Sequence, residues 1–146
     1  MLICDFSILN KYGKLLLDEM LVPLNVNWRE LVVLLVLDWS PGCNQSYLFE
    51  YLQTDKGNVT KLINRMDEAG FIIRKVDPHD KRKRKLYLDK KGRDLIPALK
   101  DVLEQWEEKC CDCLNNEQKE LYKQLNKIVV DQFLKMIQPI EKDGEK

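Results

Sequence analysis

The sequence contains a single histidine, His79, and no glycine-rich loop of the kind that holds a phosphate group. Nucleophilic catalysis needs a base beside the nucleophile, and no histidine stands near a serine or cysteine in a recognisable catalytic pattern. A zinc site needs about four ligands, and the group Cys110-Cys111-Asp112-Cys113 has neither a second cysteine pair nor a histidine to complete one. We therefore predict a protein that is not an enzyme and that uses no metal and no cofactor.

The sequence also lacks any apolar run near the roughly 20 residues that a membrane-spanning helix needs. Its first 13 residues have no basic region and include Asp5, which is unlike a signal peptide. The five cysteines are odd in number and irregularly spaced, which is typical of free thiols and not of a disulfide framework. We expect a cytoplasmic protein with no membrane partner.

The chain has no net charge, but its charges are segregated. Lys+Arg and Asp+Glu number 3 and 6 in residues 1–52, 13 and 6 in residues 53–93, and 8 and 12 in residues 94–146. The three segments thus carry −3, +7 and −4. A strongly positive middle segment between acidic ones indicates a defined polyanion-binding face and not a generally basic protein.

The positive segment begins with an amphipathic helix that follows Asp55 and ends before Gly70. Its apolar residues recur at i, i+3, i+4 and i+7, so one face is suited to burial; they are Val59, Leu62, Ile63 and Met66. Thr54 or Asp55 can cap the start, and Gly70 is placed to end the helix. The opposite face carries Gly57, Lys61, Asn64 and Glu68.

A β-hairpin is expected to follow this helix. Residues 71–73 and 86–88 have the composition of two short strands, and five consecutive cations at 81–85 lie in the turn between them. A charged hairpin alone would fit many small α/β proteins. The order of helix, glycine, strand, basic turn and strand instead favours a winged helix, in which a helix enters the DNA major groove and the hairpin reaches phosphates or the minor groove.

The remaining residues predict a mainly α protein with this small β-hairpin wing. Helices are expected over residues 3–21, 27–39, 44–52, 90–114 and 117–137, and a short third strand against the wing is expected just after residue 42. Helix 44–52, the three-residue link from Gln53 to Asp55 and the amphipathic helix that follows form a helix-turn-helix. The first helix and the last two have apolar stripes outside this motif, which predicts packing in a two-fold homodimer.

Residues 47–92 resemble the MarR family (multiple-antibiotic-resistance regulators) without a gap. The family pattern has leucines in the first helix of the motif, then stVtrlvdrLe.kGl..R, a D.R wing and LT.kG. The matching residues here are Leu48, Leu52, Val59-Thr60-Lys61-Leu62, Asn64-Arg65-Met66, Gly70-Phe71, Arg74, Asp77-Pro78, Asp80-Lys81-Arg82, Leu88 and Gly92. The flanking helices also follow the family's order.

The resemblance implies one MarR-like domain over residues 1–146. It divides into a winged-helix DNA-binding lobe at 27–93, dimerisation helices at 1–22 and 94–138, and a disordered tail at 139–146. The implied function is that of a dimeric transcriptional regulator, usually a repressor, which binds a palindromic operator on double-stranded DNA. Release by a small phenolic or other aromatic ligand, or by thiol oxidation, is also implied.

Four residues depart from the family pattern. Phe49 stands where a small alanine is usual, so helix packing there should differ. Asn64 replaces a common aspartate that often pairs with the wing arginine, which should weaken that link and could alter base choice. Gly57 places a flexible residue on the reading face, and Asp89 replaces the usual threonine but keeps a capping oxygen.

Fifteen residues are candidates for DNA contact. Lys61, Asn64 and Gly57 are expected to face base edges, because lysine can donate to guanine and asparagine can bond bidentately to adenine. Phosphate contacts are expected from Gln45, Ser46, Lys56, Asn58, Thr60 and Arg65. Arg74 is a candidate for a backbone contact only. By resemblance, Arg82 is the favoured minor-groove residue and Asp80 its orienting partner, with Lys81, Lys83 and Arg84 as competitors.

Two further sets of residues bear on regulation. Aromatic residues in the family's usual effector region are candidates to contact an aromatic ligand, and the alternative is that they belong to the core; they are Tyr12, Trp28, Trp39 and Tyr47. Cys4, Cys110 and Cys113 are candidates for redox sensing, although Asp5 beside Cys4 argues against the low thiol pKa that a sensor needs. A winged-helix protein-interaction module is the other alternative, but it has no need of the +7 charge.

Overall fold

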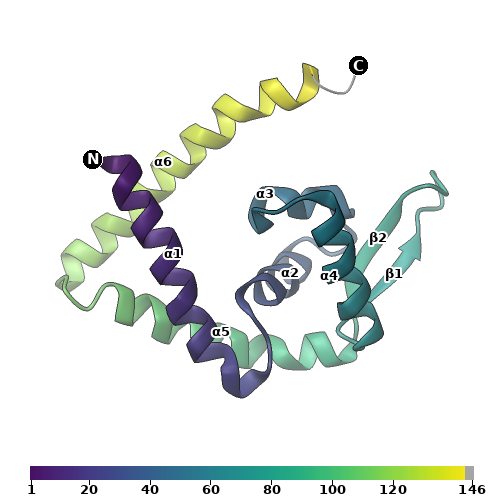
Figure 1. Cartoon of the computed structure of the whole chain (residues 1–146), viewed down its shortest axis with the longest axis horizontal. Coiled ribbons are helices and arrows are strands. Elements are labelled where there is room, and N and C mark those ends of the chain that lie inside the picture. Colours follow the sequence, from purple (N-terminus) through teal and green to yellow (C-terminus); the bar gives the residue numbers. More distant parts are fainter. Residues whose placement is uncertain (144–146) are drawn as a thin grey trace. The chain divides into compact units, whose positions relative to one another are not determined.

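The computed structural model describes the backbone of residues 1–143 and the side chains as far as residue 137. The chain divides into two compact units, residues 1–106 and the part from residue 107 onward. In chain order the elements are α1 (Leu2–Leu21), the 3₁₀ helix η1 (Val22–Leu24), α2 (Trp28–Trp39), the 3₁₀ helix η2 (Gln45–Leu48), α3 (Phe49–Leu52), α4 (Lys56–Glu68), β1 (Ile72–Val76), β2 (Arg84–Leu88), α5 (Lys90–Cys110) and α6 (Asn116–Asp143) (Figure 1). The predicted fold class, mainly α with a β-hairpin, is confirmed.

Helix α2 lies at the centre of the core of the first unit. Asn27 caps it: its side-chain oxygen accepts from the Glu30 amide at 3.0 Å, and its own amide donates to the Glu30 carboxylate at 3.0 Å. Five residues from Leu31 to Leu37 are buried. A helix that is apolar on nearly all sides, as this one is, is typically buried in the core.

The first helix of the helix-turn-helix is shorter and tighter than expected. The segment predicted as one helix over 44–52 begins as 3₁₀ helix η2 and continues as the single α-turn α3. Leu48 and Leu52 are fully buried, as the sequence predicted. Gln53 then adopts a left-handed conformation with φ of 50°, which turns the chain toward α4.

Helix α4 has the predicted limits at both ends. Asp55 is the cap, since its carboxylate accepts from the Asn58 amide at 2.8 Å. At the other end Gly70 has a φ of +80°, and its amide donates to Asp67 O while the Phe71 amide donates to Met66 O, both at 3.0 Å. These two bonds form a Schellman motif, in which glycine reverses the chain into the hairpin at little steric cost.

The hairpin pairs β1 with β2 in antiparallel register, from Ile72 opposite Leu88 to Val76 opposite Arg84. Both strands extend further toward the turn than the sequence predicted. The expected third strand is wrong for the described residues, where the sheet has two strands. Gly42 and Cys43 do bond to both backbone groups of Leu86, at 2.8 and 2.9 Å, but the pairing ends there because η2 begins at Gln45.

Helix α5 begins near Asp89, whose carboxylate accepts from the Lys90 amide at 2.8 Å. It ends at Cys110, earlier than the predicted Leu114. In the first unit, Trp106 of α5 donates its indole N–H to the Gly13 carbonyl of α1 at 2.8 Å.

In the second unit, Asn115 caps α6 by accepting from the Gln118 amide at 2.9 Å, and Gln118 accepts from the Asn115 amide at 3.0 Å. The helix was predicted to end at residue 137, with a disordered tail from residue 139. The helical backbone instead continues to Asp143. Residues 144–146 of the predicted tail lie outside the described residues.

No single helix in residues 1–143 is long and apolar enough to cross a membrane. The segment of α1 and η1 reaches the required length and apolar character only when α2 is added, and the two are bent by 78° relative to each other.

Candidate nucleic-acid interface

The polar face of α4 is directed outward by the burial of its apolar face. Val59, Leu62, Ile63 and Met66 are at most 3% exposed, which fixes the rotation of the helix about its axis. The predicted contact residues Lys56, Gly57, Asn58, Thr60, Lys61 and Arg65 are exposed, and Asn64 is partly buried. The helix therefore presents two lysines and an arginine on the side away from the core.

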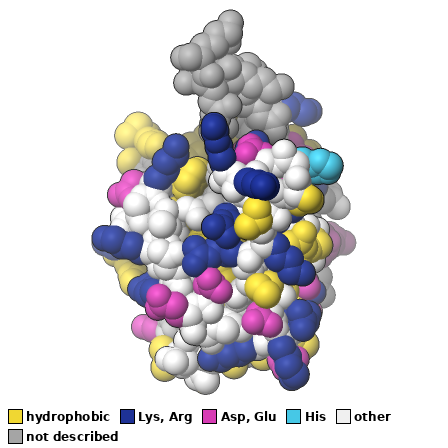
Figure 2. Space-filling view, turned by 90° about the vertical axis from the view of Figure 1, so that its right-hand side faces the viewer, with side chains coloured by type: hydrophobic (Ala, Val, Ile, Leu, Met, Phe, Trp, Pro, Cys, Tyr) yellow, Lys and Arg dark blue, Asp and Glu magenta, His cyan; other side chains and the backbone are white. Residues whose placement is uncertain are grey.

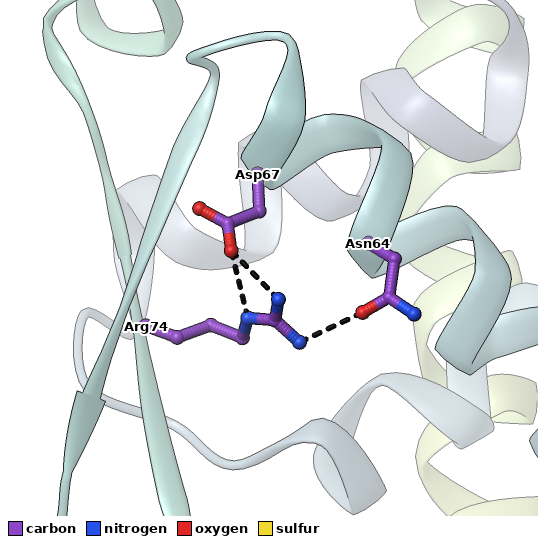
Figure 3. A network of polar contacts seen from close by, with 3 residues as sticks. All are labelled: Asn64, Asp67 and Arg74. Carbon is purple, nitrogen blue, oxygen red and sulfur yellow. Dashed lines mark hydrogen bonds and ion pairs between the residues drawn. The ribbon is translucent and has the colours of Figure 1, made fainter.

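A network of three side chains joins the hairpin to α4 (Figure 3). The Arg74 guanidinium of β1 binds the Asp67 carboxylate through Nε at 2.9 Å and Nη2 at 2.7 Å. Its Nη1 donates to the Asn64 carbonyl oxygen at 2.8 Å. Arg74 was predicted as a DNA-backbone contact, and the structure places its guanidinium against Asn64 and Asp67 of α4.

The same network shows how Arg74 is held although position 64 is an asparagine and not an aspartate. Asp67 lies one helical turn beyond Asn64 and supplies the carboxylate, while Asn64 keeps a hydrogen bond to the same guanidinium. Sequence analysis missed Asp67. The signal available was its i+3 spacing from Asn64, which places the two side chains on one face of the helix.

Several predicted phosphate contacts already have partners within the helix-turn-helix. Gln45 donates its side-chain amide to the Thr60 hydroxyl at 2.8 Å, which ties η2 to α4. The side-chain nitrogen of Asn58 donates to the Thr54 hydroxyl and to the Asp55 carboxylate, each at 3.1 Å. Ser46 donates to the Asn44 side chain. These residues stiffen the motif, whereas the cations of α4 extend from it.

The turn of the hairpin is shaped by two aspartates that accept backbone N–H groups. Asp77 accepts from the His79 amide at 2.9 Å, and Asp80 accepts from the Arg82 amide at 3.0 Å. The bond from the His79 amide lowers the pKa of the Asp77 carboxyl below its usual value. Asp80, the predicted orienting partner of Arg82, thus contacts the backbone amide of Arg82.

The five cations at 81–85 surround this turn. Lys81, Arg82, Lys83 and Arg84 are exposed, and Lys85 is partly buried. Figure 2 shows dark-blue Lys and Arg side chains distributed over one face of the molecule, with the one histidine, in cyan, at its edge. The turn therefore presents a concentrated positive charge on exposed, flexible side chains, which is suited to a polyanion.

The four candidate ligand-binding aromatics do not come together in one pocket. Trp28 and Trp39 are the first and last residues of α2, so they lie about 16 Å apart along the helix axis. Lys14 Nζ lies 3.9 Å from the Trp28 ring centre, and Arg29 lies 4.7 Å from it. Tyr12 is 58% exposed. The separation of Trp28 from Trp39 follows already from their places at the two ends of the helix predicted over residues 27–39.

Trp39 and Tyr47 instead form an aromatic cluster with Tyr51, which was not among the predicted ligand residues. The Tyr51 ring centre lies 6.2 Å from that of Trp39 and 5.8 Å from that of Tyr47, both edge-on. The hydrogen bond to Tyr47, assisted by burial, raises the pKa of Tyr51 to about 12. The i, i+4 spacing of the two tyrosines was the signal that could have identified Tyr51.

The candidate redox cysteines are dispersed. Cys4 is exposed near the start of α1, and Cys110 is the last residue of α5. Cys113 lies in the turn that follows, outside the helix that was predicted to continue to residue 114. Burial, together with the charges of Cys111 and Glu107, raises the pKa of the Cys110 thiol and disfavours the reactive thiolate.

Comparison with known proteins gives consistent matches. The MarR family model matches residues 26–83. The transcriptional regulator HosA of Escherichia coli O111:H- is 31% identical over 85 residues, which cover 58% of this chain and 63% of HosA. The chain therefore matches less than two thirds of the length of that relative. HosA is named as a regulator and not as an enzyme, in agreement with the prediction made for this chain.

Two solved structures have the same fold. A MarR transcriptional regulator from Methanosarcina mazei Go1 has a TM-score of 0.82 at 26% identity, over 90% of this chain and 95% of the other. A mutant MarR from E. coli, solved in complex with operator DNA, has a TM-score of 0.74 at 22% identity, over 85% of this chain and 89% of the other.

Proposed function

Because this chain belongs to the MarR family, we propose that it is a transcriptional regulator that binds double-stranded DNA at a palindromic operator. The observation that carries the proposal is the outward polar face of α4 beside a hairpin turn with four exposed cations in succession. A helix of this kind fits the major groove, and a basic hairpin reaches phosphates or the minor groove. A neighbour of the same fold was solved with its operator DNA.

In this proposal the contact residues have distinct roles. Lys61 and Asn64 face base edges, and Gly57 lets the backbone of α4 approach the groove closely. Lys56 and Arg65 bind phosphates, while Gln45, Ser46, Asn58 and Thr60 hold the helix-turn-helix and lie beside the DNA backbone. Arg82 enters the minor groove, and Lys81, Lys83 and Arg84 supply charge around it.

We further propose that the protein acts as a homodimer. Each unit by itself leaves large apolar side chains exposed: Leu2, Ile3, Phe6 and Leu9 on α1, and Leu121, Leu125, Ile128, Val129 and Phe133 on α6. Exposed apolar patches of this kind mark protein interfaces. A second copy with two-fold symmetry would cover them and would set two α4 helices about one DNA turn apart, matching a palindrome.

We further propose that the protein is a repressor and that a small aromatic effector releases it from its operator. The cluster of Trp39, Tyr47 and Tyr51 supports this proposal, because Trp39 and Tyr47 are exposed and edge-on aromatic rings offer surface for another ring. Thiol control has less support, since the pKa of Cys110 is raised. The alternative function, a winged-helix protein-interaction module, does not account for the positive charge of the hairpin turn.

The test is selection of bound sequences from a random duplex pool, followed by a salt titration on the winner. A two-fold symmetric site is expected, with an affinity that falls steeply as salt rises, by a log–log slope of about −0.9 for each phosphate contacted. Absence of enrichment from reduced, refolded protein would contradict the proposal and favour the interaction module.

A further inference from the structure

The orientation of the Asn64 side chain is determined by Arg74. An asparagine side chain carries one acceptor, the carbonyl oxygen, and one donor, the NH₂ group. Here the oxygen accepts from Arg74 Nη1 at 2.8 Å, and the nitrogen points away from the guanidinium (Figure 3). The donor end of the amide is therefore the end available for another partner.

The opposite orientation of the amide is disfavoured by the chemistry of arginine. A guanidinium has five N–H donors and no acceptor. If the amide turned over, its NH₂ group would face the N–H groups of Arg74, and the hydrogen bond would be lost. Arg74 itself is anchored by two contacts to the Asp67 carboxylate, at 2.9 and 2.7 Å, so it cannot easily move to accommodate a turned amide.

This arrangement bears on base recognition. Bidentate recognition of adenine by asparagine needs both ends of the amide, because the oxygen accepts from N6 and the nitrogen donates to N7. At Asn64 the oxygen faces the Arg74 guanidinium and accepts from it, and only the nitrogen is directed away from it (Figure 3). The adenine expectation drawn from the sequence therefore does not fit the network.

We infer that Asn64 reads the major groove as a hydrogen-bond donor only, with Asp67 and Arg74 as the residues that position it. The inference rests on the proposed DNA-binding function. A donor finds two acceptors, N7 and O6, on the guanine edge, whereas cytosine presents the N4 amino donor there. Guanine is the preferred base at the position that Asn64 contacts, and cytosine is the least accepted one.

The decisive variant is Asn64→Asp, which keeps the shape of the side chain and the acceptor for Arg74. It replaces the outward NH₂ donor with a carboxylate oxygen, which is an acceptor. Selection from the random duplex pool should then recover a site in which one base on the contacted strand of each half-site changes from guanine to cytosine. The preference of the wild-type protein between these two bases should be on the order of fivefold.

Gln45→Glu is the matched control, because it makes the same amide-to-acid change outside the base-reading position. It should weaken binding to all duplexes alike and leave the selected sequence unchanged. A second variant, Arg74→Ala, frees the Asn64 amide to turn, so adenine should become as acceptable as guanine at that position. Circular dichroism and thermal unfolding establish that each variant is folded.

The outcomes separate the inference from the proposed function. Failure of the wild-type protein to enrich any site would contradict DNA reading itself. Enrichment of a symmetric site with no change of base in either Asn64→Asp or Arg74→Ala would overturn the role of Asn64 and leave the regulator intact. Inversion at one base pair per half-site, absent from Gln45→Glu, would support the inference.

Discussion

Gly92 and the carbonyl oxygen of Phe71 approach so closely that a Cβ at position 92 would lie 2.2 Å from that oxygen. The same oxygen accepts a hydrogen bond from the Asp89 amide at 2.9 Å, so it cannot withdraw without cost. This approach packs the start of α5 against the residue that opens the hairpin. It gives a physical reason for the glycine that the sequence resemblance matched.

Gly92→Ala should lower the free energy of unfolding by about 1–3 kcal/mol, because backbone atoms must move to relieve the overlap. The loss should occur although alanine is the better helix former by about 1 kcal/mol. Urea denaturation monitored by circular dichroism measures the change. Gly70→Ala is an informative comparison, since nothing lies within 4 Å of its Cβ and only the φ of +80° opposes it. A Gly92→Ala protein as stable as the wild type would contradict the packing described.

Arg82→Ala should weaken operator binding by about 1–3 kcal/mol if Arg82 enters the minor groove. Fluorescence anisotropy on the selected duplex gives the affinity. Lys135→Ala on α6 removes a cation outside the proposed interface and serves as the control. Equal affinities for Arg82→Ala and the wild type would exclude Arg82 from the interface.

Removal of the Lys61 side chain should change which sequence is preferred, because a lysine that donates to guanine contributes to discrimination between bases. Selection with Lys61→Ala should return a site with relaxed preference at one base pair per half-site. Uniform weakening on every duplex, with the sequence preference retained, would instead make Lys61 a phosphate contact.

The Asp77 carboxyl should titrate below its ordinary pKa of 3.8, because the charged form accepts the His79 amide. Its contribution to stability is then fully present above the unfolded pKa and is lost as pH falls through the lower folded pKa. The amide resonance of His79, followed by NMR in acid, should report the midpoint. Asp77→Asn should abolish this titration, and a wild-type midpoint at or above 3.8 would contradict the hydrogen bond.

Ile128→Arg should shift the proposed dimer toward monomer, because Ile128 is 64% exposed in the apolar stripe of α6 and a charge there would be buried in the interface. Sedimentation velocity measures the oligomeric state. Lys127→Ala changes the neighbouring residue and should leave the state unaltered. A wild-type protein that remains monomeric at the concentrations needed for DNA binding would contradict the homodimer.

Sequence alone was sufficient for the features that depend on neighbours in the chain. The caps at Asn27 and Asp55 and the glycine stop at Gly70 each act within about four residues, so the local sequence carries the whole signal. The burial of one face of α4 follows in the same way from apolar residues at i, i+3, i+4 and i+7. With the hairpin and its basic turn, these features were sufficient to predict the winged helix.

Tertiary structure decided which distant side chains meet. The sequence contains Asn64, Asp67 and Arg74, but only the packing of the hairpin against α4 brings the guanidinium to both partners and so leaves Asn64 with an outward donor. The bond from Trp106 to Gly13 across 93 residues likewise depends on packing between elements. A local pattern determines an element and its buried face because its interactions lie within a few residues. The partners across elements are determined only when the whole core is assembled.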